Sequence, residues 1–217
     1  MANGAPRVQR SGPTRNGAAS DAALRSVSSR QAILDAAREL FSDRGYTATS
    51  IADIVARSGS SVGLPYYHFG SKKDIFLTLW NEYQASQAAH TRAAVAEARR
   101  HGANGLDLLL VGTRAYLEGA WRTRDILPMI HSRDTPGGFD AVIRDADRRW
   151  ERQNRALLSE YDPQLVRTAV VMVEGALGAV CLKLPKCRND TEADQLIDSA
   201  LLLFAALLSG LASRTAR

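Results

Sequence analysis

The sequence predicts an all-α protein with a small N-terminal helical domain and a larger helical domain behind it. Apolar residues recur along most of the chain at the i, i+3, i+4 and i+7 spacing of one helix face. No segment shows the period-two alternation of a strand, and no internal repeat is present. The length of 217 residues also suits a small domain followed by a larger one.

The composition is that of a soluble globular protein with enough apolar residues for a core, since 45% are hydrophobic and 24% are charged. The formal net charge of +5 permits a nucleic-acid partner. The base composition of the genome explains the same excess equally simply, because nearly all of the positive charge is arginine. The only lysines are Lys72, Lys73, Lys183 and Lys186.

The cysteines and the apolar runs exclude several classes of protein. The two cysteines, Cys181 and Cys187, provide no disulfide framework and no metal-ligand spacing, so we expect no metal and no cofactor. A redox pair is possible in principle, but a small buried residue and an unrelated loop thiol is the simpler interpretation. The N-terminus lacks the apolar run of a signal peptide. The longest uninterrupted apolar run, Ala200–Leu208, is short of the ~20 residues of a membrane span, so we expect a cytoplasmic protein without membrane contact.

The first ordered helix is expected to begin near Ser28 or Ser29, either of which can cap it, and to end before Gly45. Its apolar stripe consists of Ile33, Ala36, Ala37, Leu40 and Phe41. Residues 1–27 show no periodicity and are expected to form a disordered basic tail.

Residues 28–72 have the sequence form of a helix-turn-helix domain. Ser50 and Asp53 resemble a capping box for a short second helix, which Ser58-Gly59 ends in a tight turn. A third short segment runs from about Ser61 to Phe69, and Ser71 can cap a long fourth helix. Residues 73–217 are predicted to form the second, all-helical domain.

The second helix of such a unit lies in the DNA major groove and presents its N-terminal residues to the bases. The small Ser60, Ser61 and Gly63 would let the backbone approach phosphate, while Tyr66, Tyr67 and His68 carry polar tips for phosphate or sugar. Any helical bundle can contain a short helix and a glycine turn, so the spacing alone leaves a structural role open. The basic tail is likewise either a solvated leader or an arm that touches DNA.

The run from Ser29 to Leu79 resembles the TetR family of bacterial repressors. The matching segments are, in order, RQAILDAARELFSDRGY, TSIADIVARSG and SSVGLPYYHFGSKKDIF. The resemblance implies a homodimer that binds a palindromic operator in double-stranded DNA and is released by a small-molecule effector bound in the C-terminal domain. It also implies DNA contacts from Thr49, Ser50, Ser61, Val62, Gly63, Leu64, Tyr66, Tyr67, His68 and Lys72.

Two residues depart from the family pattern. Pro65 replaces the commoner aliphatic residue, and if Ser61 caps the helix, Pro65 lacks an N–H that the first turn needs. Either the helix begins late, near Leu64, or its first turn is loosened. Ser60 replaces the usual valine and removes an apolar contact beneath the turn.

The last two long helices are apolar over most of their girth, which predicts that each buries a second face against a partner subunit. A monomer with both helices at its centre is the alternative. An effector site is expected among the middle helices, although each candidate is also suited to plain core. The candidates for its wall are Trp80, Tyr83, Tyr116, Trp121, Met129, His131, Phe139, Trp150, Met172 and Cys181.

Two other functions remain as alternatives. Catalysis is not expected, because the sequence contains no nucleophile elbow, no glycine-rich phosphate loop and no HExxH motif. A helical ligand-binding or scaffold protein that no longer binds DNA is the second alternative, because Pro65 and Ser60 alter the helix-turn-helix.

Overall fold

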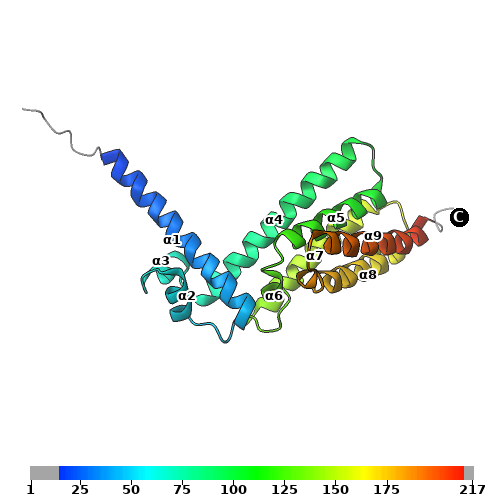
Figure 1. Cartoon of the computed structure of the whole chain (residues 1–217). Helices are drawn as coiled ribbons and strands as arrows, with labels where there is room; N and C mark the ends of the chain where they lie inside the picture. Colours follow the sequence, from blue (N-terminus) through cyan, green and yellow to red (C-terminus); the bar gives the residue numbers. More distant parts are fainter. Residues whose placement is uncertain (1–14, 213–217) are drawn as a thin grey trace, which may run out of the picture.

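The computed structural model describes residues 15–212, which form helices and their connections without a strand (Figure 1). This confirms the predicted all-α class. The helices are α1 (Arg15–Arg44), α2 (Ile51–Ser58), α3 (Leu64–Phe69), α4 (Lys72–Arg100), α5 (Gly105–Arg122), α6 (Leu127–Ile130), α7 (Phe139–Leu157), α8 (Pro163–Cys181), the 3₁₀ turn η1 (Leu184–Lys186) and α9 (Asp190–Ala212).

The helices divide into two parts, which we call the head (α1–α3) and the body (α4–α9). In the head, α1 packs on both α2 and α3. Helix α4 leaves the head and runs along the body, where α5 packs against it over a long stretch (Figure 1). Helices α8 and α9 lie side by side on one face of the body, and α5 packs on both of them.

Helix α1 begins at Arg15, thirteen residues before the expected start at Ser28. The prediction of a disordered tail is therefore wrong for residues 15–27, and residues 1–14 lie outside the described part of the chain. The reason lies in local propensity. The segment Ala18–Leu24 has four alanines and no proline or glycine, which favours continuation of the helix without an apolar stripe.

One hydrophobic cluster runs from the head into the body. Phe41 of α1 and Phe76 of α4 have ring centroids 5.6 Å apart, and Phe76 meets Phe139 of α7 edge to face at 5.0 Å. Phe139 in turn contacts the ring of Trp80 at 5.1 Å. Close packing of large rings transmits a displacement of one ring to the next, so the head and body are mechanically linked at this point.

By length and composition alone, two stretches, residues 163–186 and 190–211, are apolar enough to cross a membrane. They correspond to α8 with η1 and to α9. About a third of each stretch is buried inside the protein, and core helices pass the same test.

Candidate nucleic-acid interface and ligand cavity

Helix α3 and the turn before it expose an uncharged polar and aromatic surface. Tyr67 is 79% exposed, Val62 69% and Tyr66 54%, and Ser61 and Gly63 are exposed as well. Residues 60–70 contain no acidic residue, lysine or arginine. Large exposed hydrophobic side chains on a short helix are unusual in a surface that serves only solvation, and they suit contact with bases or sugars.

Helix α3 begins late, and this removes the difficulty that Pro65 raised. Gly63 is its N-cap, and Pro65 is the second helical residue, where its missing N–H needs no partner. The first backbone bond inside the helix is donated by Tyr67 to Gly63 (3.0 Å). Pro65 is buried under the helix, while Leu64 is half-buried. Of the two alternatives given for Pro65, the structure shows the one in which α3 begins late, at Leu64.

Helix α2 is held at both ends as predicted. Ser50 and Asp53 form a full capping box, in which the Ser50 Oγ accepts from the Asp53 N–H (3.1 Å) and the Asp53 carboxylate accepts from the Ser50 N–H (2.8 Å). Gly59 ends the helix in the left-handed conformation, with φ +67°. Ser50 is exposed at the start of α2, where a phosphate would meet the helix N-terminus.

The Thr49 side chain is not available for the phosphate contact that the resemblance implied. The residue is 1% exposed, and its hydroxyl donates to the carbonyl oxygens of Gly45 (2.8 Å) and Leu40 (3.3 Å). The side chain therefore ends α1 and shapes the turn that follows it. A sequence pattern does not distinguish these roles, because a threonine before a helix suits both.

Lys72 and His68 are likewise occupied inside the head. Lys72 Nζ donates to the carbonyl oxygens of Tyr46 (2.8 Å) and Thr49 (2.7 Å) and lies 4.1 Å from the centroid of the Tyr46 ring. Its expected role as a free phosphate ligand is therefore corrected, since two of its three N–H groups bind the protein itself. The ring Nε2 of His68 hydrogen-bonds to Ser29 Oγ (3.1 Å), so His68 also attaches α3 to α1.

A cavity of about 770 Å³ lies in the body, between α4, α5, α7 and α8. This volume falls in the range of small-molecule sites in proteins. Five of the predicted wall residues line it: Trp80, Tyr83, Tyr116, His131 and Trp150. Its lining also includes aliphatic residues such as Leu108, Ile130, Ile143 and Leu177. Most of the exposed surface of the cavity is therefore apolar or aromatic, although polar and charged side chains also line it.

Tyr83, Tyr116 and Gln87 form a connected polar network in the cavity wall. Gln87 Nε2 donates to Tyr83 Oη (3.1 Å) and to the Tyr116 carbonyl oxygen (3.3 Å), and the two tyrosine hydroxyls are 3.4 Å apart. Burial raises the pKa of both tyrosines, so each hydroxyl keeps its proton. The network keeps these rings in place and leaves few of their polar atoms for a ligand.

His131 differs from the other polar wall residues because its Nε2 is buried without a hydrogen-bond partner among the described residues. Burial lowers the pKa of its imidazole, so the ring is neutral at neutral pH. A neutral imidazole offers one donor and one acceptor. A ligand with a hydroxyl or a carbonyl would satisfy it, whereas a group that needs an imidazolium would not.

Two carboxylates, Asp147 of α7 and Glu174 of α8, face each other at the cavity wall. Desolvation raises the pKa of each, and the Asp147 charge raises that of Glu174 further. Arg92, Arg99 and Arg149 also line the cavity, so its rim carries both signs of charge. The rim therefore selects no single charge type.

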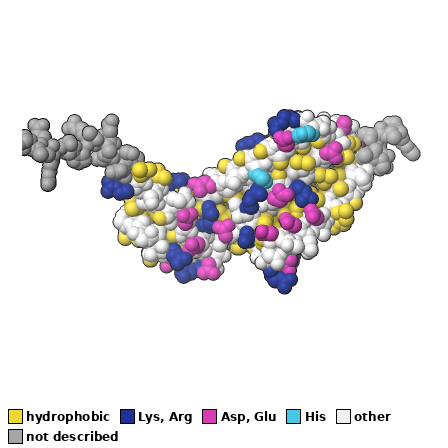
Figure 2. All heavy atoms as spheres, turned by 45° about the horizontal axis from the view of Figure 1, so that its top comes forward, with side chains coloured by type: hydrophobic (Ala, Val, Ile, Leu, Met, Phe, Trp, Pro, Cys, Tyr) yellow, Lys and Arg dark blue, Asp and Glu magenta, His cyan; other side chains and the backbone are white. Residues whose placement is uncertain are grey.

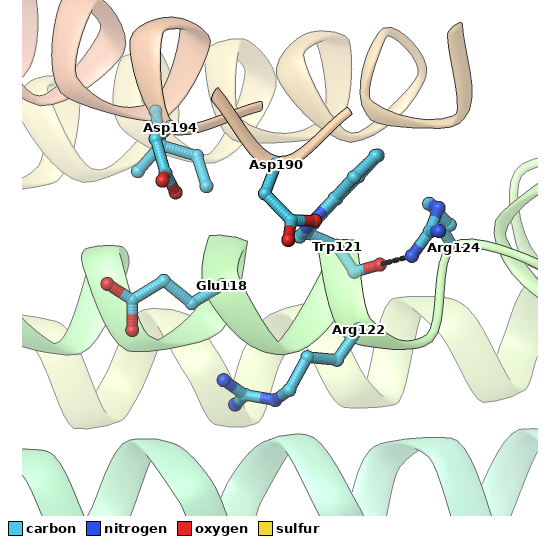
Figure 3. A pocket seen from close by; sticks show the side chains of 7 residues that line it. Glu118, Trp121, Arg122, Arg124, Asp190 and Asp194 are labelled. Carbon is cyan, nitrogen blue, oxygen red and sulfur yellow. Dashed lines mark hydrogen bonds between the residues drawn. The ribbon is translucent and has the colours of Figure 1, made fainter. Parts of the chain in front are cut away.

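The other five predicted wall residues lie elsewhere. Met129 and Phe139 are fully buried core, Cys181 is buried next to Tyr116, and Met172 is 51% exposed on the outer face of α8. Trp121 lines a separate surface depression between the end of α5 and the start of α9 (Figure 3). There its indole N–H donates to Asp190 (3.0 Å), and the Arg124 guanidinium stacks 3.9 Å above its ring. Helical spacing alone could not separate these positions from the cavity wall.

The structure adds wall residues that were not predicted, above all Gln87. Gln87 is 4% exposed and lies seven residues after Trp80 and four after Tyr83 on α4. A polar residue on a buried apolar stripe is the signal that could have identified it. Asp147 and Glu174 offered no such signal, because their helices are brought together only by the fold.

Among residues 15–212, no group of three or more His, Cys, Asp or Glu side chains could hold a metal ion. Cys181 and Cys187 are both free. Burial raises the pKa of the Cys181 thiol to about 12, so it is unreactive at neutral pH.

Comparison with known proteins agrees with this architecture. A family profile described as bacterial regulatory proteins of the tetR family matches residues 33–79. The repressor AcnR of Corynebacterium efficiens is 39% identical over 62 residues, which cover 29% of this chain and 33% of AcnR. The regulator QacR of Staphylococcus aureus is 49% identical over 49 residues, covering 23% of this chain and 26% of QacR. The matched segment thus spans about a third or less of these relatives.

The similarity of fold extends further than the similarity of sequence. The crystal structure of a TetR-like transcriptional regulator from Rhodococcus sp. RHA1 superposes with a TM-score of 0.67 over 86% of this chain and 97% of that chain. Its sequence identity is 24%, so this likeness concerns the fold. Residues 33–79 therefore carry the helix-turn-helix domain of the tetR family of bacterial regulatory proteins, and the chain as a whole has the fold of a TetR-like regulator.

Proposed function

We propose that the protein is a transcriptional repressor that binds operator DNA through α3 and is released by a small molecule in the body cavity. The observation that carries the proposal is the exposed surface of Ser61, Val62, Gly63, Tyr66 and Tyr67, which lies within the segment that matches the tetR family profile. Ser50 is exposed at the start of α2, but its hydroxyl donates to the Asp53 carboxylate (2.6 Å), so its main role is to cap the helix. Leu64 supports this surface from beneath rather than contacting bases.

Because the α3 surface is uncharged, contact with bases and general attraction to phosphate come from different residues. Tyr66, Tyr67 and the backbone near Gly63 would contact bases and sugars, while general attraction to phosphate comes from other residues of the positively charged chain. Lys72 acts as a positioning residue, because it fixes the α1–α2 turn relative to α4. His68 positions α3 on α1 in the same way.

We further propose a homodimer joined through α8 and α9. Both helices keep one apolar face outside the core of the single chain, with Val171 56%, Met172 51%, Leu202 72% and Leu203 67% exposed. Hydrophobic side chains gather at the surface over this end of the molecule (Figure 2). The exposed Gly175, Ala176, Ala205, Ala206 and Gly210 between them would allow close approach of a second copy. The dimer also accounts for the two apolar stretches without a membrane, consistent with a cytoplasmic protein.

The cavity suggests an effector with a mainly apolar, aromatic-stacking body. Trp80, Tyr83, Tyr116 and Trp150 supply the rings, and His131 supplies the one buried polar atom that lacks a partner in the described wall. The effector would therefore carry a hydroxyl or carbonyl group at the His131 end.

DNA binding is tested with fragments selected by the purified protein from a random-sequence pool. The proposal expects enrichment of a twofold-symmetric sequence and an affinity that falls as salt rises. Tyr67→Ala should weaken binding by about tenfold, the loss of one good base or sugar contact, without changing the melting temperature. Tyr46→Phe serves as the control, because the Tyr46 ring packs inside the head. Absence of any enriched sequence would favour the alternative of a helical ligand-binding protein that has lost DNA binding.

A further inference from the structure

The connection between α6 and α7, residues 131–138, touches the cavity at its start and the head at its middle, and the residue after it packs on the cavity wall. His131, at its start, lines the cavity. Phe139, directly after it, packs edge to face on Trp80, another wall residue, at 5.1 Å. Between them lies Asp134, whose carboxylate binds the turn that joins α1 to α2.

The contact of Asp134 with the head is specific and tightly built. Its Oδ2 accepts from the backbone N–H of Thr47 (2.9 Å), and its Oδ1 accepts from the Thr47 hydroxyl. Those two bonds lower the pKa of Asp134, so the carboxylate is ionised at neutral pH. Gly45 has φ +85°, and a Cβ at that position would overlap the Asp134 carboxylate. The turn is thus shaped to receive this side chain.

A second bond holds the same connection to the start of α4. Lys73 Nζ donates to the Gly137 carbonyl oxygen (2.9 Å). The turn that Asp134 binds is the same one that Lys72 holds through the Tyr46 and Thr49 carbonyl oxygens. A shift of residues 131–138 would therefore act directly on the residues that orient α2 and α3.

We infer that residues 131–138 couple the cavity to the head: a ligand that occupies the cavity displaces His131 and Phe139, and this displacement releases Thr47 from Asp134. The released turn no longer holds α2 and α3 in one orientation for DNA. The inference rests on the proposed function, because it assigns the regulation of that same site. It differs from a signal carried along α4 alone, which also runs from the head to the cavity.

The coupling can be tested without knowing the effector, by attaching a covalent occupant to the cavity wall. Ala146 of α7 lines the cavity and is changed to cysteine in a Cys187→Ser background, then labelled with monobromobimane. Cys181 stays unlabelled because burial raises its pKa to about 12. Arg152→Cys, exposed on the same helix and outside the cavity lining, is the matched control. Ile143→Cys, also in the wall, replaces Ala146→Cys if that labelled variant does not fold.

Two readouts decide the inference. Bimane at residue 146 should raise the hydrogen-exchange rate of the Thr47 amide by about tenfold and weaken binding to the selected DNA by a similar factor. Bimane at residue 152 should change neither by more than about twofold. In Asp134→Ala, the Thr47 amide should already exchange fast, and the cavity label should add no more than about twofold to either quantity.

Two results would contradict the inference. If the cavity label weakens DNA binding in Asp134→Ala as strongly as in the parent, α4 carries the signal and the inference is overturned. Unchanged Thr47 exchange in the labelled parent overturns it as well. A protein that selects no DNA defeats the proposed function, but the exchange measurement still decides whether the cavity and the turn are coupled.

Discussion

The ammonium group of Lys72 lies 2.7 Å from the carbonyl oxygen of Thr49, and both residues were expected to contact phosphate. A lysine in the first turn of a helix is disfavoured by the helix dipole, so its position needs a compensating partner. The carbonyl oxygens of Thr49 and Tyr46 are those partners. The contact between Lys72 and Thr49 therefore stabilises the head, which contains α3.

Lys72→Ala should destabilise the protein and weaken DNA binding without removing a phosphate contact. We expect a loss of about 1 to 2 kcal/mol in the free energy of unfolding, because two carbonyl oxygens lose a charged donor. The slope of log affinity against log salt should change by much less than the ~0.9 that one phosphate contact contributes. Urea unfolding and fluorescence titration at several salt concentrations measure the two effects. A slope change near 0.9 with unchanged stability would restore the phosphate role.

Pro65→Ala should lower stability slightly and leave DNA binding nearly intact. Pro65 is the second residue of α3, so its ring already suits the helix and restricts the unfolded chain. Its replacement should cost about 0.5 to 1 kcal/mol, through greater freedom of the unfolded chain. Tyr67→Pro is the contrasting variant, since it deletes the N–H that donates to Gly63 and should cost about 3 kcal/mol. If Pro65→Ala and Tyr67→Pro lower the free energy of unfolding by the same amount, α3 does not begin at Leu64 in solution.

Leu203→Arg should convert the protein from a dimer to a monomer. Leu203 is 67% exposed in the single chain and lies on the outer face of α9, where a buried arginine would have no partner. Sedimentation velocity at micromolar concentration should then show a species near 23.6 kDa. Leu24→Arg, at a residue of α1 that is 65% exposed, should leave the dimer unchanged. A wild-type protein that sediments only as a monomer would rule out the interface altogether.

His131 should make the stability of the protein depend on pH in a predictable direction. Burial lowers its pKa below the ordinary 6.5, so the unfolded chain binds this proton more readily than the folded one. The contribution of neutral His131 is complete above pH 6.5 and declines as the pH falls through 6.5 towards the lower folded pKa. Urea unfolding between pH 7.5 and pH 5 should therefore show a shallower loss of stability in His131→Gln than in the wild type. Parallel curves would mean that the ring is solvated in the folded protein.

The local features of the head followed from sequence because they depend on neighbours in the chain. The Ser50–Asp53 capping box, the left-handed Gly59 and the Ser71 cap of α4 are all formed by residues within a few positions of one another. The start of α1 at Arg15 is the exception. Alanine content can extend a helix without leaving an apolar stripe, so the periodicity that predicts other helices gave no sign of it.

The cavity and the link between head and body depended on tertiary structure. Ring type and helical spacing placed Trp80, Tyr83, Tyr116, His131 and Trp150 in one region, but could not separate them from core or surface residues of the same type. Which side of a helix faces a cavity depends on how neighbouring helices cross, and that is set by packing across the whole body.

By itself, the sequence determined the helical class, the capped helix-turn-helix and the uncharged surface of α3, because each follows from residues close together in the chain. Only the tertiary structure decided that Lys72 and Thr49 serve the head rather than phosphate. It alone also decided that Asp134 meets Thr47, 87 residues away in the chain. Hydrogen-bond partners at that separation are chosen by the packing of the helices between them, and no local pattern records that choice.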